Sequence, residues 1–252
     1  MNTDENPIKK QDIHPVHEDY RDEFYASYRT THVVPRKGDA TGESHAGKFP
    51  YWDRFLGPHL PASKKSQIID LGCGSGSIVA WLQHSGYMDA FGVDSSIEEV
   101  NAACALGLPV RHEEVKNFIA QYESFFDFVI LRNVLEHHHK SEILDLLKTV
   151  YKSLKKGGGV FIQVPNAESP FGSRIRYGDF THEIALTASS ITQLLSVCGY
   201  HEIVTGPVEP SLRGRRLLLW KLVQRIYKWL LYAEMGPNKY IVTQDLYAIA
   251  YS

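Results

Sequence analysis

Three titratable side chains stand within five residues in the stretch RYGDFTHE, residues 176–183. A histidine such as His182 can take the proton of a reacting hydroxyl, and a carboxylate such as Asp179 or Glu183 can orient its ring and stabilise its charged form. In the alternative, Thr181, His182 and Glu183 only tie a loop to a helix through backbone hydrogen bonds. The choice depends on where the fold places this segment.

The scaffold becomes regular from Gln67 onward, where short apolar runs alternate with helix-like patterns. Strands are expected at 67–71, 89–94, 109–112, 126–131, 159–165, 200–206 and 245–251. Helices are expected at 75–86, 97–107, 115–122 and 141–158, and another begins at Ser190, with Gln193 completing a capping box, or at Thr187. This alternation predicts an open, doubly wound α/β sheet, in which ligands bind outside the carboxyl ends of the strands.

Residues 166–187 form a long connection between the fifth expected strand and the next helix. A connection of this length in a compact domain is usually functional or disordered, and the aromatic residues Phe171, Tyr177 and Phe180 argue against disorder. Because the connection leaves the carboxyl end of a central strand, we expect GDFTHE to lie over the ligand site.

The 252 residues are 43% apolar, which is enough for a substantial core, and we expect a single folded domain. Residues 1–64 are expected to form a tail and a helical cap, with the tail mobile up to about His17. Residues 65–252 are expected to form the main domain, with a helical insertion at 207–244. The net charge of -2 gives no uniform positive field, which argues against a general nucleic-acid binder.

Cysteine usage and the amino terminus indicate the compartment. Cys73, Cys104 and Cys198 are an odd number, far apart, with neither a zinc-binding spacing nor a disulfide framework. The amino-terminal stretch is polar and has no apolar run of signal-peptide length. Both observations predict a cytoplasmic protein.

A glycine-rich turn, DLGCGSG, follows the first expected strand. Gly72, Gly74 and Gly76 let the backbone approach a ligand closely, and the start of the next helix presents free N–H groups. The spacing G-x-G-x-G differs from the dinucleotide fingerprint G-x-G-x-x-G. Asp70 would repel a pyrophosphate but attract an ammonium group. Asp94, 18 positions beyond Gly76, can hold both hydroxyls of a ribose.

IIDLGCGSG followed by FGVDSS resembles the class I S-adenosylmethionine-dependent methyltransferases. The resemblance implies a Rossmann-like, seven-stranded sheet with helices on both faces, and S-adenosyl-L-methionine as cofactor. In that family the glycine turn passes the methionine part of the cofactor, the acidic residue after the second strand holds the ribose, and the position of Glu114 contacts the adenine. The residues expected to bind the cofactor are Asp70, Gly72, Gly74, Gly76, Asp94, Ser95, Glu114, Val115, Leu131 and Tyr28.

The stretch FDFVILRNVLEHHHKSE resembles the part of the family in which the fourth strand ends beside the transferred methyl group, followed by a loop that often reads Glu-His. His137 is therefore a second candidate for the base, and His138 and His139 are an unusual extension. Some relatives that act on phenolic rings bind a divalent ion near this loop. Adjacent side chains on a helix do not face one site, however, so we expect no metal here.

PN after the fifth strand, together with RYGDFTHE and a helix ending in GY, resembles a bacterial subset of these enzymes that is associated with cell-surface glycan biosynthesis. The resemblance implies O-methylation of a sugar hydroxyl, in such a glycan or its lipid-linked form. Arginine forks suit phosphate and aromatic faces suit sugar rings, so Arg174, Arg176, Tyr177 and Asn166 are expected to bind the acceptor. The alternative for these residues is a solvated loop edge.

Ala185 and Leu186 depart from the subset, in which an aromatic residue is common at this point, and this leaves the acceptor open. Two other functions remain: methylation of a small natural product or quinol, which a metal requirement would favour, and a cofactor-binding module without turnover. A nicotinamide-dependent dehydrogenase is a weaker alternative, which binding of NAD without S-adenosylmethionine would establish. The oligomeric state is also left open.

An amino-terminal cap is indicated by Tyr25, Tyr28 and His32, whose spacing of i, i+3 and i+7 places them on one face of a helix. In the family such a segment often closes over the cofactor, so Tyr28 or His32 could touch it, and packing alone is the alternative. A closed cap would also exclude water.

The insertion contains an amphipathic segment at 213–232. Its apolar and cationic faces consist of Leu219, Leu222, Val223, Ile226 and Leu230, and of Lys221, Arg225 and Lys228. Three central charges would cost roughly 7 to 10 kcal/mol within a bilayer, so we expect no membrane span. The segment either lies in the interface on the inner face of a membrane, anchored by Trp220 and Trp229 with its arginines facing anionic lipid, or packs on a protein surface.

Overall fold

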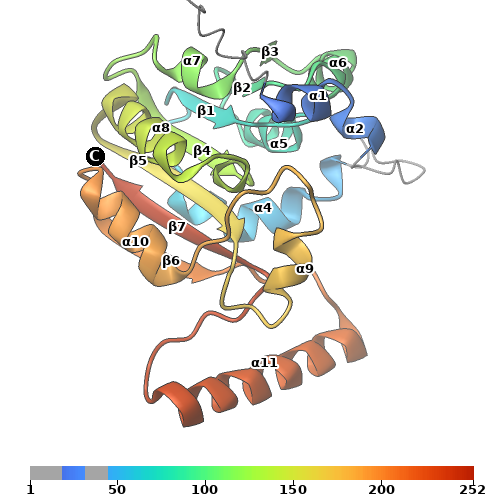
Figure 1. Ribbon diagram of the computed structural model, residues 1–252. Coiled ribbons are helices and arrows are strands. Elements are labelled where there is room, and N and C mark those ends of the chain that lie inside the picture. The colour runs from blue at the N-terminus through green and yellow to red at the C-terminus, as the bar shows by residue number, and fades with distance from the viewer. Residues whose placement is uncertain (1–18, 32–44) are drawn as a thin grey trace, which may run out of the picture.

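The structure, a computed structural model, describes residues 19–31 and 45–252, which form one seven-stranded sheet with helices on both faces (Figure 1). The strand order is β3-β2-β1-β4-β5-β7-β6. The strands are β1 (Ile68–Leu71), β2 (Phe91–Asp94), β3 (Val110–His112), β4 (Phe126–Arg132), β5 (Leu154–Pro165), β6 (His201–Pro207) and β7 (Asp245–Tyr251). The tail up to His17, and His32 of the expected cap, lie outside the described residues.

Strands β1 to β5 pair in parallel, and β7 runs antiparallel between β5 and β6. The predicted doubly wound, seven-stranded α/β fold is therefore confirmed. Since the order reverses between β1 and β4, the loops that follow these strands diverge to opposite sides and leave a crevice at the carboxyl edge of the sheet.

Helices cover the two faces of the sheet in separate groups. One face carries α7 (Val115–Ile119), α8 (Lys140–Ser153) and α10 (Ala188–Val197), and the other carries α4 (Phe49–Phe55), α5 (Ser77–His84) and α6 (Ile97–Ala105). Strand β1 shows how both cores form, because its side chains alternate between the faces. Ile69 and Leu71 join the core under α8, whereas Ile68 packs with Trp52 and Trp81 under α4 and α5.

The cap consists of two short helices, α1 (Tyr20–Ala26) and α2 (Tyr28–Thr31), which lie over α6 (Figure 1). The sequence analysis expected Tyr25 and Tyr28 on one face of a single helix, but the helix is interrupted at Ser27. Ser27 is the C-cap of α1, and its N–H donates to the carbonyl oxygen of Phe24. The two tyrosine rings still meet, edge to face, with centroids 5.9 Å apart.

The structure defines the end of α8 and the start of α10. The helix expected over 141–158 ends at Ser153, because Leu154 is buried and pairs with Phe126 at the start of β5. Helix α10 is capped by Thr187, whose side chain accepts the N–H of Ser190, so the second of the two expected starts is the right one.

The insertion contributes α11 (Gly214–Met235) between β6 and β7. Among the described residues no helix combines the length and apolar character needed to cross a membrane. The three cysteines are free, with Cys73 and Cys198 buried and Cys104 exposed.

Gly72 is expected to tolerate a side chain less well than another glycine of the same conformation. Its φ is 71° and an added Cβ would lie 2.4 Å from Cγ2 of Val134, whereas Gly107, with φ of 73°, has nothing within 4 Å. Left-handed backbone costs either alanine about 1–2 kcal/mol, and the clash adds about 1–3 kcal/mol at Gly72 alone. Urea unfolding of Gly72→Ala and the matched Gly107→Ala measures the difference. Equal destabilisation of the two variants would contradict this close approach.

Asp70 is expected to make stability fall with rising pH. It is 2% exposed, and burial raises its pKa from 3.8 to about 7. The folded protein keeps the proton at pH values where the unfolded chain has lost it, so the free energy of unfolding decreases between about pH 4 and pH 7, by about 4 kcal/mol at most. Urea unfolding across this range compares wild type with Asp70→Asn, in which this decrease is absent. Parallel pH profiles for the two proteins would show that Asp70 is ionised in the fold.

Candidate active site

Asp94 fixes the glycine turn to the end of β2. Its Oδ2 accepts the N–H of Gly74 at 2.7 Å, and its Oδ1 accepts the N–H of Ser96 at 2.8 Å. Burial raises the pKa of Asp94, and these two hydrogen bonds oppose the rise. Each carboxylate oxygen has a further lone pair with which it can accept a ligand hydroxyl.

A cavity of about 1550 Å³ lies beside this turn, at the carboxyl edge of the sheet. A site for one small molecule usually has about 300–1,000 Å³. The volume therefore fits a cofactor and an acceptor together. Of the residues expected to bind the cofactor, those in the lining are Tyr28, Gly72, Gly74, Asp94, Ser95, Glu114 and Val115.

Three residues of the expected cofactor set lie off this lining. Gly76 faces Leu108, Asp70 is buried on the side of the sheet that carries α4 and α5, and Leu131 is enclosed in the core under α8. Their positions are behind the ligand surface, where they shape the turn and the strand ends. Glu114 lines the cavity and also caps α7, since its carboxylate accepts the N–H groups of Lys116 and Asn117.

A second cluster in the cavity is centred on Asp179, which is 6% exposed. Its Oδ1 accepts the N–H and the hydroxyl of Thr181, at 2.9 and 2.7 Å. Its Oδ2 accepts the hydroxyl of Tyr28 at 2.7 Å. The loop after β5 and helix α2 of the cap thus meet at one carboxylate.

His137 and His182 stand edge to face beside Asp179, with ring centroids 4.7 Å apart. Nδ1 of His137 lies 2.8 Å from the hydroxyl oxygen of Thr181, which gives its own proton to Asp179, so Nδ1 is the donor and Nε2 carries the lone pair. Nδ1 of His182 lies 3.1 Å from the carbonyl oxygen of Ile175, which can only accept, so here too the lone pair is on Nε2. In the neutral form of either ring the basic atom is therefore Nε2, and that of His182 lies 3.8 Å from Oδ2 of Asp179.

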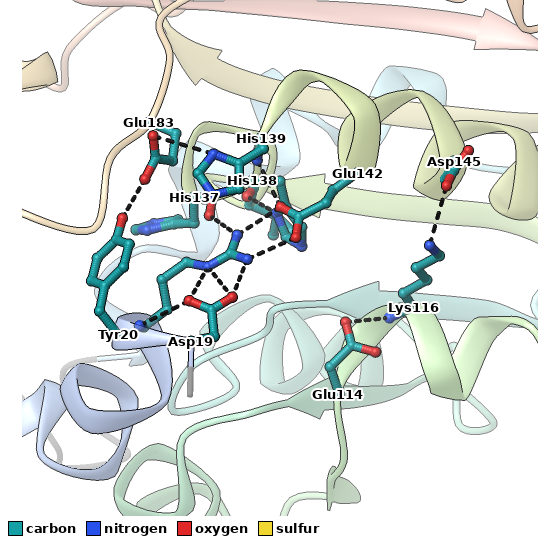
Figure 2. Close-up of polar contacts among 12 residues, drawn as sticks. Asp19, Tyr20, Glu114, Lys116, His137, His138, His139, Glu142, Asp145 and Glu183 are labelled. Atoms are coloured by element: carbon teal, nitrogen blue, oxygen red, sulfur yellow. Dashed lines mark hydrogen bonds and ion pairs between the residues drawn. The ribbon is translucent and has the colours of Figure 1, made fainter. Parts of the chain in front are cut away.

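Of the two carboxylates expected to orient His182, Asp179 lies near its ring and Glu183 does not. Oε1 of Glu183 accepts the hydroxyl of Tyr20, and Oε2 lies 3.4 Å from Nδ1 of His139 (Figure 2). The side chains of His182 and Glu183 leave the loop on opposite sides, so the sequence neighbour is the wrong partner. Glu183 instead connects α1 to the loop.

Of the four residues expected to bind the acceptor, only Arg174 is in the lining of the cavity. The guanidinium of Arg176 donates to the carbonyl oxygens of His182 and Glu183 and so holds the bend of the loop. Tyr177 is 78% exposed and lies beside that guanidinium, 5.1 Å from ring centre to Cζ.

Asn166 does not face the cavity, which corrects the expectation that it binds the acceptor. It is fully buried, and its amide donates to the carbonyl oxygens of Ile241 and Thr243 at 2.7 and 2.9 Å. Its Oδ1 accepts the N–H of Glu168. With both ends of the amide in use, Asn166 holds the end of β5 against the chain that enters β7.

Glu136 is a buried carboxyl that the sequence analysis did not separate from its histidine neighbours. It is 1% exposed, neither oxygen has a hydrogen-bond partner among the described residues, and burial raises its pKa to about 8. Ligand atoms of Glu136, His137 and His182 lie within 4.8 Å of one another, so these three could hold a metal ion. The sequence analysis expected no metal because the side chains of the adjacent histidines 137–139 diverge. In this cluster the second histidine is His182, which comes from the loop after β5.

Arg21, which sequence patterns did not single out, fastens the cap. Its guanidinium donates to both oxygens of Glu142 at 2.7 Å, to Asp19, and to the backbone carbonyl of His137 at 2.9 Å (Figure 2). The hydrogen bond from Arg21 lowers the pKa of Glu142 to about 2. Glu142 and His137 are remote from Arg21 in sequence, so local spacing gives no signal for these contacts.

Comparison with known proteins agrees with this geometry. A family model described as a methyltransferase domain matches residues 48–203. The tRNA U34 carboxymethyltransferase of Saccharophagus degradans is 28% identical over 133 residues, which cover 48% of this chain and 38% of that protein. The chain thus matches well under half the length of this curated relative.

Among solved structures, a SAM-dependent methyltransferase from Archaeoglobus fulgidus aligns with a TM-score of 0.64 at 16% identity, over 82% of this chain and 94% of the other. Phosphoethanolamine N-methyltransferase 2 of Haemonchus contortus, solved with S-adenosyl-L-methionine, aligns with a TM-score of 0.55 at 15% identity, over 94% of this chain and 58% of the other. These structures share the fold of this chain. The chain belongs to the methyltransferase domain family and has the fold of the S-adenosylmethionine-dependent methyltransferases.

Proposed function

We propose that this S-adenosylmethionine-dependent methyltransferase methylates a hydroxyl oxygen. The observation that carries the proposal is that one cavity is lined both by the glycine turn with Asp94 and by His137, Asp179 and His182. S-adenosylmethionine, when bound, supplies a methyl group activated by a sulfonium sulfur. The first group of residues suits its amino-acid and ribose parts, and the second suits a hydroxyl that must lose a proton.

His182 is the proposed base. A hydroxyl has a pKa far above neutrality, so its proton must leave as the oxygen is methylated, and a neutral imidazole can accept it. The donor role of Nδ1 toward Ile175 leaves Nε2 of His182 as the basic atom, and Asp179 at 3.8 Å stabilises the charged ring. His137 is the second candidate, because its Nδ1 is held by Thr181 and, through Thr181, by Asp179.

The cap contributes by closing the site. Tyr25 and Tyr28 both line the cavity, and their rings lie against His137 with centroids 6.2 Å away in each case. The hydroxyl of Tyr28 reaches Asp179 only when α2 is in place. Closure therefore excludes water from the reacting groups and completes the hydrogen bonds around the carboxylate at the same time.

The proposed acceptor is a sugar hydroxyl of a cell-surface glycan or its lipid-linked form, methylated in the cytoplasm or on the inner face of the membrane. Arg174 in the cavity suits a phosphate or a ring of hydroxyls. Tyr177, exposed at 78%, offers an aromatic face on which a sugar ring can stack, whereas the ring of Phe180 is stacked on Phe24. The test of the acceptor is transfer of labelled methyl from S-adenosylmethionine into glycolipid, polysaccharide and small-molecule fractions of the source cell. Label in a glycan fraction supports the proposal, and label among small molecules alone overturns the acceptor class.

His182→Ala is expected to lower the rate of methyl transfer by about 100- to 10,000-fold, because the group proposed to take the proton is removed. Cofactor affinity, measured by calorimetry, should change little, since the cofactor residues are on other segments. His201→Ala, on the exposed start of β6, is the matched control and should behave as wild type. A larger loss in His137→Ala than in His182→Ala would move the role of base to His137. Cofactor binding without transfer in the wild type would identify a binding module.

Methylation of a small natural product or quinol is a second candidate, favoured by one observation. Glu136, His137 and His182 offer one carboxylate and two imidazoles, a ligand set that holds divalent metals with positions open for a substrate. A metal held by these three residues would supply Lewis-acid activation of a substrate oxygen, and its binding would engage the same two histidines that the first proposal considers as the base.

Removal of divalent ions separates the two candidates. If His182 acts as a base, protein dialysed against a chelator keeps its transfer rate, and Glu136→Gln reduces that rate by less than the histidine variants do. The rate should be measured with metal content determined in the same samples. Loss of activity on chelation, restored by Zn²⁺ or Mn²⁺ in wild type but not in Glu136→Gln, would favour the metal-dependent candidate.

A further inference from the structure

Helix α11 is a long helix that is exposed along its whole length. It has 22 residues, none of them buried, and lies apart from the sheet at the lower end of the molecule in Figure 1. Its large apolar side chains with more than a third of their surface exposed are Leu218, Leu219, Leu222, Val223, Ile226, Trp229, Leu230, Tyr232 and Met235. At 1.5 Å per residue the helix presents this surface over about 33 Å. A contiguous apolar surface of such length on a monomer marks a site of interaction.

The helix has three sides with different surroundings. One side, which includes Leu217, Trp220 and Leu231, is half-buried. The side that includes Leu222 and Ile226 is exposed and apolar. Between them runs a cationic stripe formed by Lys221, Arg225 and Lys228, all exposed. Basic side chains that border an apolar face can lay their methylene stems along it and keep their charges outside.

The helix is attached to the same edge of the sheet as the acceptor loop. Strand β6 ends where Pro207 pairs with Leu246, and β7 begins where Asp245 pairs with Pro165, the last residue of β5. The acceptor loop, residues 166–187, leaves from that same residue. A surface bound by α11 is therefore held at the edge where the cavity lies.

The net positive charge of residues 213–235 indicates which kind of partner binds to α11. Residues 213–235 contain six basic side chains, at 213, 215, 216, 221, 225 and 228, and one acidic side chain, Glu234. A second copy of the chain, paired about a two-fold axis, would bring the same basic stripe against itself. An anionic lipid surface has the opposite charge, and it accepts both the basic stripe and the apolar side.

We propose that α11 binds in the interface of an anionic membrane, parallel to its surface, with the apolar side among the acyl chains and the basic residues at the headgroups. Trp229, exposed at 65%, is the interfacial anchor at its carboxyl-terminal half. The helix does not cross the bilayer. The further consequence, that the acceptor is presented at the membrane, rests on the proposed function, whereas lipid binding itself does not.

The full chain is tested by co-sedimentation with vesicles of phosphatidylcholine alone and of phosphatidylcholine mixed with phosphatidylglycerol. We expect binding to the mixed vesicles and much weaker binding to the neutral ones. Tryptophan emission gives a second measurement, because Trp52 and Trp81 are buried while Trp220 and Trp229 lie on α11. Brominated lipid should quench the emission of α11 and leave the emission of the core unchanged.

Two pairs of variants assign the binding to the two sides of the helix. Lys221→Glu with Arg225→Glu should weaken binding to anionic vesicles by at least thirtyfold, on the order expected for the loss of two surface cations. The same double charge reversal at the exposed Lys152 and Lys156 is its control and should weaken it several-fold less. Leu222→Ser with Ile226→Ser should abolish quenching, and Met88→Ser, another exposed apolar position, should not.

The outcomes separate this proposal from the others. Quenching that is lost in the α11 variants, with methyl transfer to a soluble acceptor unchanged, supports the membrane surface whether or not the acceptor is a glycolipid. Absence of binding to every vesicle overturns it. A dimer in light scattering that dissociates in the Leu222→Ser, Ile226→Ser protein, without vesicle binding, would also overturn it and make α11 an interface between copies.

Discussion

The carboxylate of Asp179 is the group on which the arrangement of the half of the cavity that contains His137 and His182 depends. It accepts two hydrogen bonds from Thr181 within its own loop and one from Tyr28 of the cap, and through Thr181 it fixes the tautomer of His137 at the end of β4. Three segments distant in sequence are thus held by one buried anion. Such an anion is tolerated only because donors surround it, and the same donors define the geometry of the histidines.

This arrangement couples the position of the cap to the electrostatics of the site. Glu136 and Asp179 are acidic groups buried close together, and Arg132 is the cation that acts on Glu136. If α2 moved away, Asp179 would lose the hydrogen bond from Tyr28. The position of the cap and the hydrogen bonding of this carboxyl group are therefore linked.

Much of the fold could be predicted from local patterns, because parallel strands buried on both faces, glycine turns and capped helices each have a signature in sequence. Ligands of an open α/β sheet bind outside the carboxyl ends of its strands. This rule predicted that the glycine turn, Asp94 and the loop with Asp179 and His182 lie at the cavity. The features that could not be predicted from the sequence depend on contacts between residues that are remote in the chain. Glu183 is engaged by Tyr20, and Asn166 by carbonyl groups near residue 242. The helix end at Ser153 is set by the pairing of Leu154 with Phe126.

The approach of His137 to His182 is of the same kind, since 44 residues separate Thr181 from the ring that it binds. From the local sequence alone, His137 and His182 would each be predicted to be a surface or loop residue. Their relation exists only because β4 and β5 are neighbours in the sheet, and because the N–H groups of Glu183 and Ile184 bind the carbonyl of Glu136. A single sequence records none of these pairings.

The place of α11 in the chain has a consequence for how this protein can diversify. The insertion that contains α11 starts at the end of β6 and returns to the start of β7, and these strands are adjacent and antiparallel, with Pro207 paired with Leu246. The insertion is therefore a long loop of a β-hairpin. A longer excursion adds only slowly to the entropy lost on closing the loop, roughly with the logarithm of its length. The sheet therefore tolerates exchange of this segment with little cost to the core. If α11 determines where the protein binds and the loop after β5 determines what it methylates, as proposed above, these two properties can vary separately.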